Sequence, residues 1–211
     1  MTLTLHMFPT LNAHKVTIAL EEMALAYEIV FVDILNGGQD DPAFRALNPN
    51  GRIPVLTDGP VTVFESAAIL QYLGRKSGRF YPADEVKRAE VDSWLFWQMS
   101  GLGPSSGNVN WFTRAARKDG RDPLETGLAS HRFTKETARL FDVLEIRLAG
   151  REYLCGAYSI ADMACWTWID KYPENGGGLA SRPRLAAWHA SISARPAVQH
   201  ALGVGQEFVK P

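Results

Sequence analysis

The segment between residues 48 and 69 constrains the fold of this chain more than any other. It contains Asn48-Pro49-Asn50-Gly51-Arg52-Ile53-Pro54-Val55-Leu56, a turn at Asp58-Gly59-Pro60, and then Phe64-Glu65-Ser66-Ala67-Ala68-Ile69. Pro54 directly precedes a strand-like stretch, where a proline normally interrupts strand pairing. A cis bond between Ile53 and Pro54 would cost only about 0.5–1 kcal/mol. It would leave the N–H and C=O of Ile53 facing outward, so that an extended ligand can pair with the backbone.

The residues after the turn add charge to this loop. Ser66 is expected at the start of a helix over Ala67–Leu73, where backbone N–H groups and the helix dipole favour a carboxylate. Glu65 can pair with an ammonium group. Together they suit an α-amino acid end, such as the γ-glutamyl group of glutathione. Taken alone, Ile53-Pro54 is more simply explained as a turn and Ser66 as a helix cap, but the combination in this order is more specific.

The hydrophobic pattern changes between residues 76 and 87. The earlier part predicts strands over Thr2–Met7 and Tyr27–Val32, with an intervening helix that includes Val16 and Leu20, then a hairpin across Asp58-Gly59-Pro60 and a final helix. That order is typical of a thioredoxin-like α/β unit. The later part predicts helices over about 87–100, 126–148, 160–171 and 184–194, which form a helical bundle. Ser159 and Asp162 predict a capping box before the third of these.

Composition agrees with a folded enzyme-sized protein without identifying it. The chain has 211 residues, 46% of them hydrophobic, which suffices for one or two domains. A net charge of -1 gives no electrostatic reason to expect a nucleic acid or a membrane surface as partner. The sequence lacks both a membrane-spanning apolar run and a basic-then-apolar N-terminus, so we expect a soluble, cytoplasmic protein. Cys155 and Cys165 form no CxxC or metal-binding spacing, which predicts reduced thiols and no metal.

A resemblance to a known family rests on these stretches: Pro9–Lys15, Gly37–Gln39, Asn48–Leu56, Phe64–Ser66, Trp94–Met99 with Gly101–Pro104, and Ser159–Asp162. Together they resemble the glutathione transferase superfamily, and the similarity covers nearly the whole chain. Within that superfamily, the chain is most similar to the bacterial Nu class and its glutathione-dependent disulfide-bond oxidoreductase relatives, which share ancestry with a fungal nitrogen regulator. The resemblance implies a thioredoxin-like glutathione-binding domain over residues 1–78 and an all-α domain over 86–211. It also implies a homodimer whose active sites lie at the subunit boundary.

The chemistry is expected where the first strand turns into the first helix. Thr10 and Asn12 lie there, and each can donate a hydrogen bond to an anionic sulfur at the positive end of the helix dipole. The resemblance implies that a Thr and an Asn at these positions hold the glutathione sulfur. The alternative is that both residues only cap the helix.

Other ligand contacts follow from the resemblance. Gln39 is expected to reach the glycyl end of glutathione, with Arg52 as a nearby positive charge, while Ile53, Pro54, Glu65 and Ser66 hold the rest of the tripeptide. Arg132 aligns with an arginine that approaches the site from the helical domain or from the partner subunit. Arg52 could equally be a solvated loop residue and Arg132 part of a surface salt bridge. Lys15 could face the same cleft, although the helix surface is the default position for a lysine.

The aromatic residues of the second half predict a core and interface stripe, made of Trp94, Phe96, Trp97, Trp111 and Phe112. Gly101-Leu102-Gly103-Pro104 is expected to end the first helix of the bundle, so that residues 105–112 fold over the active-site cleft as a wall or lid. The reductase relatives carry a Gln-Asn-His-His-like run after the position of Gly107. This chain carries Asn108-Val109-Asn110-Trp111, so Asn108, Asn110 and Trp111 become the candidates for a second-substrate pocket.

The sequence therefore predicts a glutathione-dependent enzyme without a metal, in which glutathione is a co-substrate. The preferred reaction is disulfide reduction with two glutathiones, because no redox cysteine lies near Thr10 and both thiols must then be ligands. Conjugation of glutathione to a small electrophile is the alternative. A noncatalytic glutathione-binding regulatory protein is the second alternative, against which stands the intact set of expected ligand-binding residues.

Overall fold

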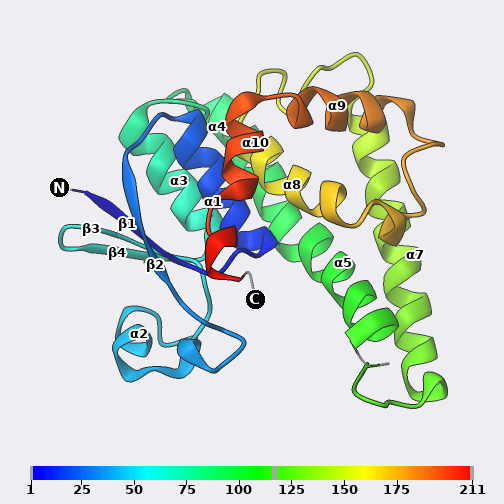
Figure 1. Cartoon of the computed structure of the whole chain (residues 1–211). Coiled ribbons are helices and arrows are strands. Elements are labelled where there is room, and N and C mark those ends of the chain that lie inside the picture. Colours follow the sequence, from blue (N-terminus) through cyan, green and yellow to red (C-terminus); the bar gives the residue numbers. More distant parts are fainter. Residues whose placement is uncertain (1, 116–117, 210–211) are drawn as a thin grey trace. The chain divides into compact units, whose positions relative to one another are not determined.

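The computed structural model describes residues 2–115 and 118–209 of the chain (Figure 1). Its contacts divide the chain into two compact units. The first contains residues 1–88 together with 193–211, and the second contains residues 89–192. This division groups the C-terminal residues 193–211 with the first unit, whereas the prediction from sequence places them in the all-α domain over 86–211.

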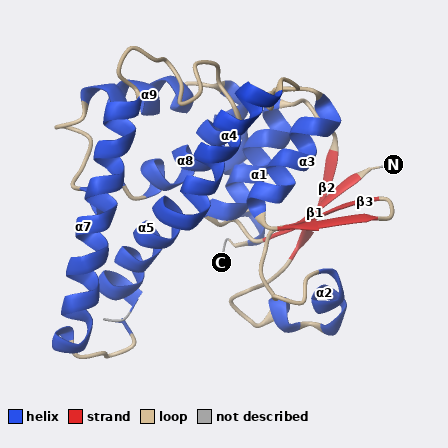
Figure 2. Ribbon diagram, turned by 180° about the vertical axis from the view of Figure 1, so that it is seen from behind, coloured by secondary structure: helices blue, strands red, loops and turns tan. Residues whose placement is uncertain are grey.

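A four-stranded mixed sheet forms one layer of the first unit (Figure 2). The strands are β1 (Leu3–Met7), β2 (Tyr27–Phe31), β3 (Val55–Asp58) and β4 (Val61–Phe64), in the order β2-β1-β3-β4. β1 is parallel to β2 and antiparallel to β3, and β3 and β4 form the predicted hairpin. Alternate residues of β1 are buried, as expected for a strand with one face against helices.

The helices of this unit are α1 (Leu11–Glu22), α2 (Pro42–Leu47) and α3 (Ser66–Ser77), with a short 3-10 turn at Gly38–Asp40. α1 and α3 pack against each other. This arrangement confirms the thioredoxin-like α/β fold. The α2 helix was absent from the sequence prediction, because six residues are too few to show a helical period.

The first unit is completed from the other end of the chain. α10 (Pro196–Gly203) packs along α1, where the hydroxyl of Thr17 donates a hydrogen bond to the carbonyl oxygen of Ala201 at 3.3 Å. The guanidinium of Arg195 binds the buried carboxylate of Glu22 with two hydrogen bonds. A final 3-10 turn, Gln206–Phe208, follows.

The second unit is helical, as predicted. Its helices are α4 (Glu85–Trp97), which starts in the first unit, then α5 (Gly103–Asn110), α7 (Pro123–Arg147), α8 (Ile160–Lys171) and α9 (Pro183–Ser193). A 3-10 turn at Pro173–Gly176 joins α8 to the loop before α9. Its core contains fully buried side chains from α7 and α8, including Phe141, Leu144 and Trp166.

The expectation that Gly101-Leu102-Gly103-Pro104 ends a helix is wrong. A π-helical turn at Gln98–Leu102 leads directly into α5, whose first turn holds Pro104. Proline is tolerated in the first turn, where its missing N–H would have no partner. A Cβ on Gly103 would lie 2.7 Å from Nε2 of Gln98, so this glycine allows close packing. Residues 105–112 are accordingly helical and do not form a lid loop.

The aromatic stripe is also not a core stripe within the chain. Trp94 and Trp97 are half-buried, and Phe96 and Trp111 are 56% and 42% exposed. Val91 and Leu95 form the buried face of α4 instead. Trp94, Phe96 and Trp97 do lie on a helix, as their spacing predicts, but they occupy the more exposed faces of α4 beside the buried one.

The capping box of α8 is confirmed. The carboxylate of Asp162 is fully buried and accepts hydrogen bonds from the backbone nitrogens of Leu154 and Ser159 and from the indole nitrogen of Trp188, at 2.9–3.0 Å. The hydroxyl of Ser159 is a fourth donor. Burial raises the pKa of Asp162 above its ordinary value, although these hydrogen bonds oppose the change. Asp162 thereby ties the start of α8 to the preceding loop and to α9.

Candidate active site

A small pocket in the first unit brings together three segments that are distant in the sequence. It has a volume of about 100 Å³ and is formed by the first turn of α1, the loop before β3 and the start of α3. Six of the seven residues that line it were predicted as site residues. The seven are Asn12, Asn48, Arg52, Ile53, Pro54, Glu65 and Ser66.

The loop before β3 is held by Asn48, a residue of the sequence motif for which no role was predicted. Its side chain is 2% exposed. Nδ2 donates to the carbonyl oxygen of Arg52 at 2.7 Å, and Oδ1 accepts from the backbone nitrogen of Asn50 at 3.1 Å. The Ile53–Pro54 peptide bond is cis, as predicted. The role of Asn48 could have been predicted from its place before a Pro-Asn-Gly turn. The side chain of an Asn in such a turn commonly forms a hydrogen bond with the backbone two residues onward.

Glu65 and Ser66 form the opposite wall. Glu65 is exposed and has a φ of 71°, in the left-handed region that a residue with a side chain rarely adopts. It also occupies the cap position of α3, while Ser66 is the first helical residue and is buried. The interpretation of Ser66 as only a helix cap is therefore wrong. Glu65 thus lies at the N-terminus of a twelve-residue helix. The backbone N–H groups at that helix end favour the carboxylate of a bound ligand.

Thr10 and Asn12 lie at the start of α1, but only Asn12 lines the pocket. Thr10 is the cap residue, and its Oγ1 accepts a hydrogen bond from the backbone nitrogen of Ala13 at 3.4 Å. The backbone nitrogen of Thr10 in turn donates to the carbonyl oxygen of Phe8 at 2.7 Å. A hydroxyl that accepts one hydrogen bond retains its own proton for donation, so capping does not prevent Thr10 from binding an anion.

Other predicted contact residues lie elsewhere. Gln39 is half-buried in the 3-10 turn after β2, where Nε2 donates to Asp40 at 3.1 Å and Oε1 is buried without a hydrogen-bond partner in the part of the chain that the structure describes. Arg132 is exposed on α7, in the second unit. Lys15 is only 1% exposed, so its expected default position on the helix surface is wrong.

The candidates for the second-substrate pocket lie near the end of α5, in the second unit. Asn108 and Asn110 are half-buried, and Asn108 donates to the carbonyl oxygen of Pro104 at 2.9 Å. The Trp111 ring stacks on Phe112 at 5.9 Å, and Phe112 stacks on Phe133 of α7 at 5.8 Å with 7° between the ring planes. These rings make an aromatic surface rather than a polar pocket.

The two cysteine thiols are poor nucleophiles. Cys155 is half-buried, and burial, with the nearby carboxylates of Asp162 and Glu90, raises the pKa of its thiol to about 12. Cys165 is fully buried in α8. Because the thiolate is the reactive form, the chain does not provide a sulfur nucleophile of its own at neutral pH.

Within residues 2–115 and 118–209, no three His, Cys, Asp or Glu side chains are placed to hold a metal ion. Likewise, none of the helices in these ranges is long and apolar enough to cross a membrane.

A thioredoxin-like unit with a cis-proline pocket, followed by a helical unit, matches one family in both parts. Residues 1–75 match the glutathione S-transferase N-terminal domain, and residues 118–202 match the glutathione S-transferase C-terminal domain. The chain belongs to the glutathione S-transferase family.

Individual relatives are similar over nearly the full length. The chain is 41% identical to the disulfide-bond oxidoreductase YfcG of Escherichia coli, over 94% of this chain and 93% of that protein. It also superposes on a glutathione transferase from Burkholderia graminis that holds two glutathione molecules per subunit, with a TM-score of 0.89, 38% identity, and coverage of 96% of this chain and 88% of that one. A glutathione transferase from Pseudomonas putida, with one glutathione disulfide bound per subunit, superposes with a TM-score of 0.87. It is 37% identical, over 96% of this chain and 91% of that one.

Proposed function

We propose that this protein is a glutathione-dependent disulfide-bond oxidoreductase. The observation that carries the proposal is the pocket in which Asn12, the Ile53–Pro54 loop and the Glu65–Ser66 pair meet beside Thr10. The high pKa of Cys155 supports a reaction in which both attacking thiols belong to ligands. The similarity to YfcG of Escherichia coli, and to a protein that holds two glutathiones per subunit, agrees with this reaction.

Glutathione has a place in this pocket for each of its polar groups. The ammonium group of its γ-glutamyl end pairs with Glu65, and the carboxylate of that end binds at Ser66 and the N-terminus of α3. The cysteinyl backbone pairs with the backbone of Ile53. The sulfur accepts hydrogen bonds from Thr10 and Asn12.

The reaction then proceeds by two thiol–disulfide exchanges. The bound glutathione thiolate attacks one sulfur of the substrate disulfide, a new S–S bond forms, and the other sulfur leaves as a thiolate that takes up a proton. A second glutathione thiolate attacks the glutathione sulfur of this mixed disulfide and releases the second substrate thiol. One disulfide is reduced and two glutathiones are oxidised to glutathione disulfide.

Hydrogen bonds to the sulfur explain only part of such catalysis. Lowering a thiol pKa of about 8.5 by two units raises the thiolate fraction at pH 7 about 25-fold. Thiolate reactivity then falls with a Brønsted slope of about 0.4–0.5, which removes nearly a factor of ten. Since the net gain is only a few-fold, Thr10 and Asn12 contribute mainly by holding the sulfur in line with the disulfide.

The remaining assignments complete this proposal. Gln39 and Arg52 bind the glycyl carboxylate, and Arg132 approaches glutathione from the helical domain or from a partner subunit. Asn108, Asn110 and Trp111 belong to the second-substrate pocket. We place the protein in the cytoplasm as a homodimer, because glutathione is kept reduced there and the exposed Phe96 suits a subunit contact.

A second candidate function is conjugation of glutathione to a flat electrophile. The stacked rings of Trp111, Phe112 and Phe133 favour it, because aromatic faces bind planar groups. The same thiolate serves both reactions, so only the electrophile distinguishes them.

The test is steady-state turnover with glutathione and either 2-hydroxyethyl disulfide or 1-chloro-2,4-dinitrobenzene. Thr10→Ala is compared with Thr62→Ala, an exposed threonine on β4 of the same unit. Faster disulfide turnover, lost in Thr10→Ala only, is the expected result. Faster conjugation would favour the second function. If glutathione binds and neither electrophile reacts, the oxidoreductase proposal fails in favour of a noncatalytic glutathione-binding protein.

A further inference from the structure

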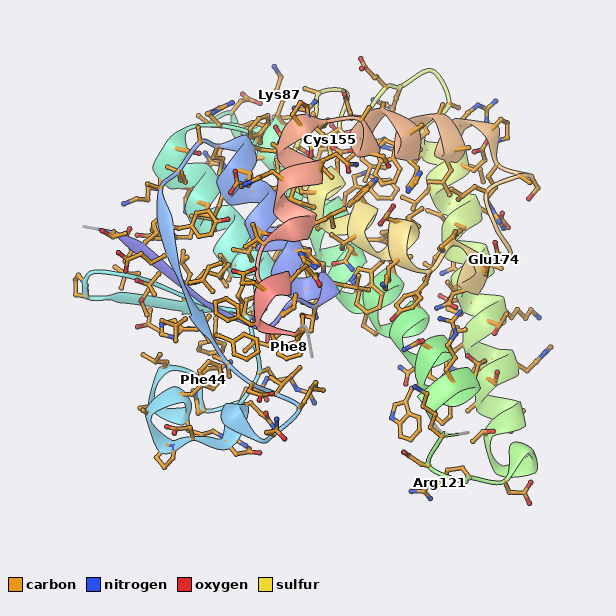
Figure 3. All side chains as sticks on the ribbon, viewed as in Figure 1. Phe8, Phe44, Lys87, Arg121, Cys155 and Glu174 are labelled. Carbon is orange, nitrogen blue, oxygen red and sulfur yellow. The ribbon has the colours of Figure 1, made fainter. Side chains whose placement is uncertain are left out.

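The short helix α2 connects the two segments that the proposed function assigns to the glycyl end of glutathione. Gln39 belongs to the 3-10 turn before α2, and Arg52 belongs to the loop after it. Figures 1 and 2 show α2 on the opposite side of the sheet from α1 and α3. Phe44 packs with Val32 and Val55 in a buried cluster, and Figure 3 shows it on the side of α2 that faces the sheet. The helix is thus fixed to the sheet between the two segments.

Arg45, on the exposed side of α2, contacts both of these segments. Its Nη2 donates to Oδ1 of Asp40 at 2.5 Å, and its Nη1 donates to the carbonyl oxygen of Pro49 at 2.9 Å. The guanidinium also lies directly against Gly51, where a Cβ would be only 2.4 Å from Cζ of Arg45. A side chain at Gly51 would therefore displace the guanidinium. One arginine thus bonds to the turn before α2 and to the loop after it.

Both contacts of Arg45 lead to residues that are expected to bind the ligand. Asp40 accepts a hydrogen bond from Nε2 of Gln39 at 3.1 Å. Because an amide nitrogen carries two N–H groups, Gln39 keeps one of them for a ligand. The carbonyl oxygen of Arg52 is bonded to the residue before Pro49. Gln39 does not line the small pocket, but Arg45 links its turn to a loop that does.

This link has more to offer to binding than to stability. The side chains of Arg45 and Asp40 are 43% and 59% exposed, and an exposed ion pair adds little to the free energy of folding. A ligand that meets two unconnected loops must order both of them, which reduces affinity. A link that is already present in the free protein removes part of that cost.

We infer that Arg45 is a positioning residue for the glycyl end of glutathione, which holds Gln39 and Arg52 in register before the ligand binds. The inference rests on the proposed function, in which these two residues bind the glycyl carboxylate, and deepens it by naming the residue that aligns them. Arg45 itself does not touch the ligand. It acts through Asp40 and through the carbonyl group of Pro49.

The experiment measures by calorimetry the binding of glutathione and of γ-glutamylcysteine, which lacks the glycyl residue but keeps the γ-glutamyl end and the thiol. Wild type is compared with Arg45→Ala, Arg88→Ala and the double variant Arg45→Ala/Asp40→Asn. Arg88 is the matched control, because this arginine of the same unit also binds one carboxylate and backbone carbonyl oxygens, at residues 82–85.

We expect wild type to prefer glutathione, and Arg45→Ala to weaken glutathione binding by about five- to tenfold, which corresponds to ordering one or two side chains. Binding of γ-glutamylcysteine should change less than about twofold in Arg45→Ala, as should binding of both ligands in Arg88→Ala. The double variant should bind glutathione as weakly as Arg45→Ala, because removing the charge of Asp40 does not restore the link.

Other results would overturn the inference. Recovery of glutathione binding in the double variant would show that Arg45 only neutralises Asp40 beside the ligand carboxylate. An equal loss of both ligands in Arg45→Ala would indicate a general disturbance of the loop before β3, and unchanged binding would exclude a role for Arg45. If wild type binds both ligands equally, the glycyl end is not held and the inference fails, while binding of the γ-glutamyl end stands. If wild type binds neither ligand, the proposed function itself fails, and the inference fails with it.

Discussion

The side-chain oxygen of Thr10 accepts a hydrogen bond from the backbone nitrogen of Ala13. The hydroxyl group of Thr10 therefore caps α1 and, in the proposed function, also donates a hydrogen bond to the glutathione sulfur. Capping fixes the position of the oxygen, which is what alignment of a bound sulfur requires. The two interpretations of Thr10 that the sequence left open are compatible.

Replacement of Thr10 should separate these contributions. Thr10→Ser keeps the cap and the donor and should retain most activity. Thr10→Ala loses a hydrogen bond to a charged acceptor, worth about 1.5–3 kcal/mol, and should slow disulfide turnover by about 10- to 150-fold. It should also lower the free energy of unfolding by about 0.5–2 kcal/mol through the lost cap. The pKa of bound glutathione, followed by thiolate absorbance, should rise by no more than about two units for the same lost bond, and a rate loss of only a few-fold beside that rise would contradict the positioning role.

The backbone of Glu65 predicts that stability and binding respond in opposite directions. Its left-handed conformation costs about 1–3 kcal/mol for a residue with a side chain. Glu65→Gly relieves that cost and should be at least as stable as wild type, whereas Glu65→Ala retains it. Both variants should bind glutathione more weakly, because the partner of the ammonium group is gone. Denaturant unfolding and calorimetry measure the two effects, and tight binding by either variant would remove Glu65 from the site.

Cys155 should be chemically silent. With a pKa of about 12, its thiolate fraction stays very small up to pH 9 and increases tenfold with each further pH unit. Labelling of the folded protein by iodoacetamide should therefore be slow at pH 8, and fast only in denaturant. Cys155→Ser should leave disulfide turnover unchanged. Rapid labelling, or loss of turnover in this variant, would point to a protein thiol in the reaction.

Asp162 should be essential for stability. Asp162→Asn replaces a carboxylate oxygen by an NH₂ group, which cannot accept the hydrogen bonds from Leu154 or Trp188, and each buried donor left unsatisfied costs about 1–3 kcal/mol. Asp170→Asn, on the same helix but half-buried, is the matched control and should cost less. Urea unfolding measures both, and equal effects would show that the capping box is not responsible.

Asp58 gives a prediction for acid stability. Its carboxylate pairs with the ammonium group of Lys76 and accepts a hydrogen bond from the hydroxyl of Tyr72, and these contacts hold the pKa of Asp58 below the ordinary value. A lowered pKa in the folded state contributes stability above the ordinary pKa, near 4, that is lost as the pH falls through the lowered one. Asp58→Asn should thus be less stable than wild type at pH 7, with a difference that shrinks below pH 4. Thr62→Ala, an exposed and uncharged position on β4 of the same sheet, should show no such trend.

Much of the first unit could be predicted from sequence because its signals are local. The hairpin turn at Gly59-Pro60, the alternation in β1 and the loop before Pro54 each depend on adjacent residues. The pocket could be predicted for the same reason, since Ile53, Pro54 and Ser66 lie within one short segment.

The failures share a different origin, because they depend on tertiary packing. Gly101 and Gly103 looked like a helix end, yet Gly103 lies against Gln98 in a continuing helix. Lys15 is buried although its type favours the surface. The position of α10 against α1 could not be inferred either, since that packing joins residues more than 180 positions apart.

The return of α10 to α1 has a consequence for biosynthesis. Residues 89–192 form a continuous unit, whereas the sheet unit needs α10, which leaves the ribosome only after that whole stretch. The apolar face of α1 that α10 covers must wait for it while the helical unit is made, although domains otherwise tend to fold in the order of synthesis. The active-site unit, which begins first, is thus expected to be completed only after the helical unit has been made.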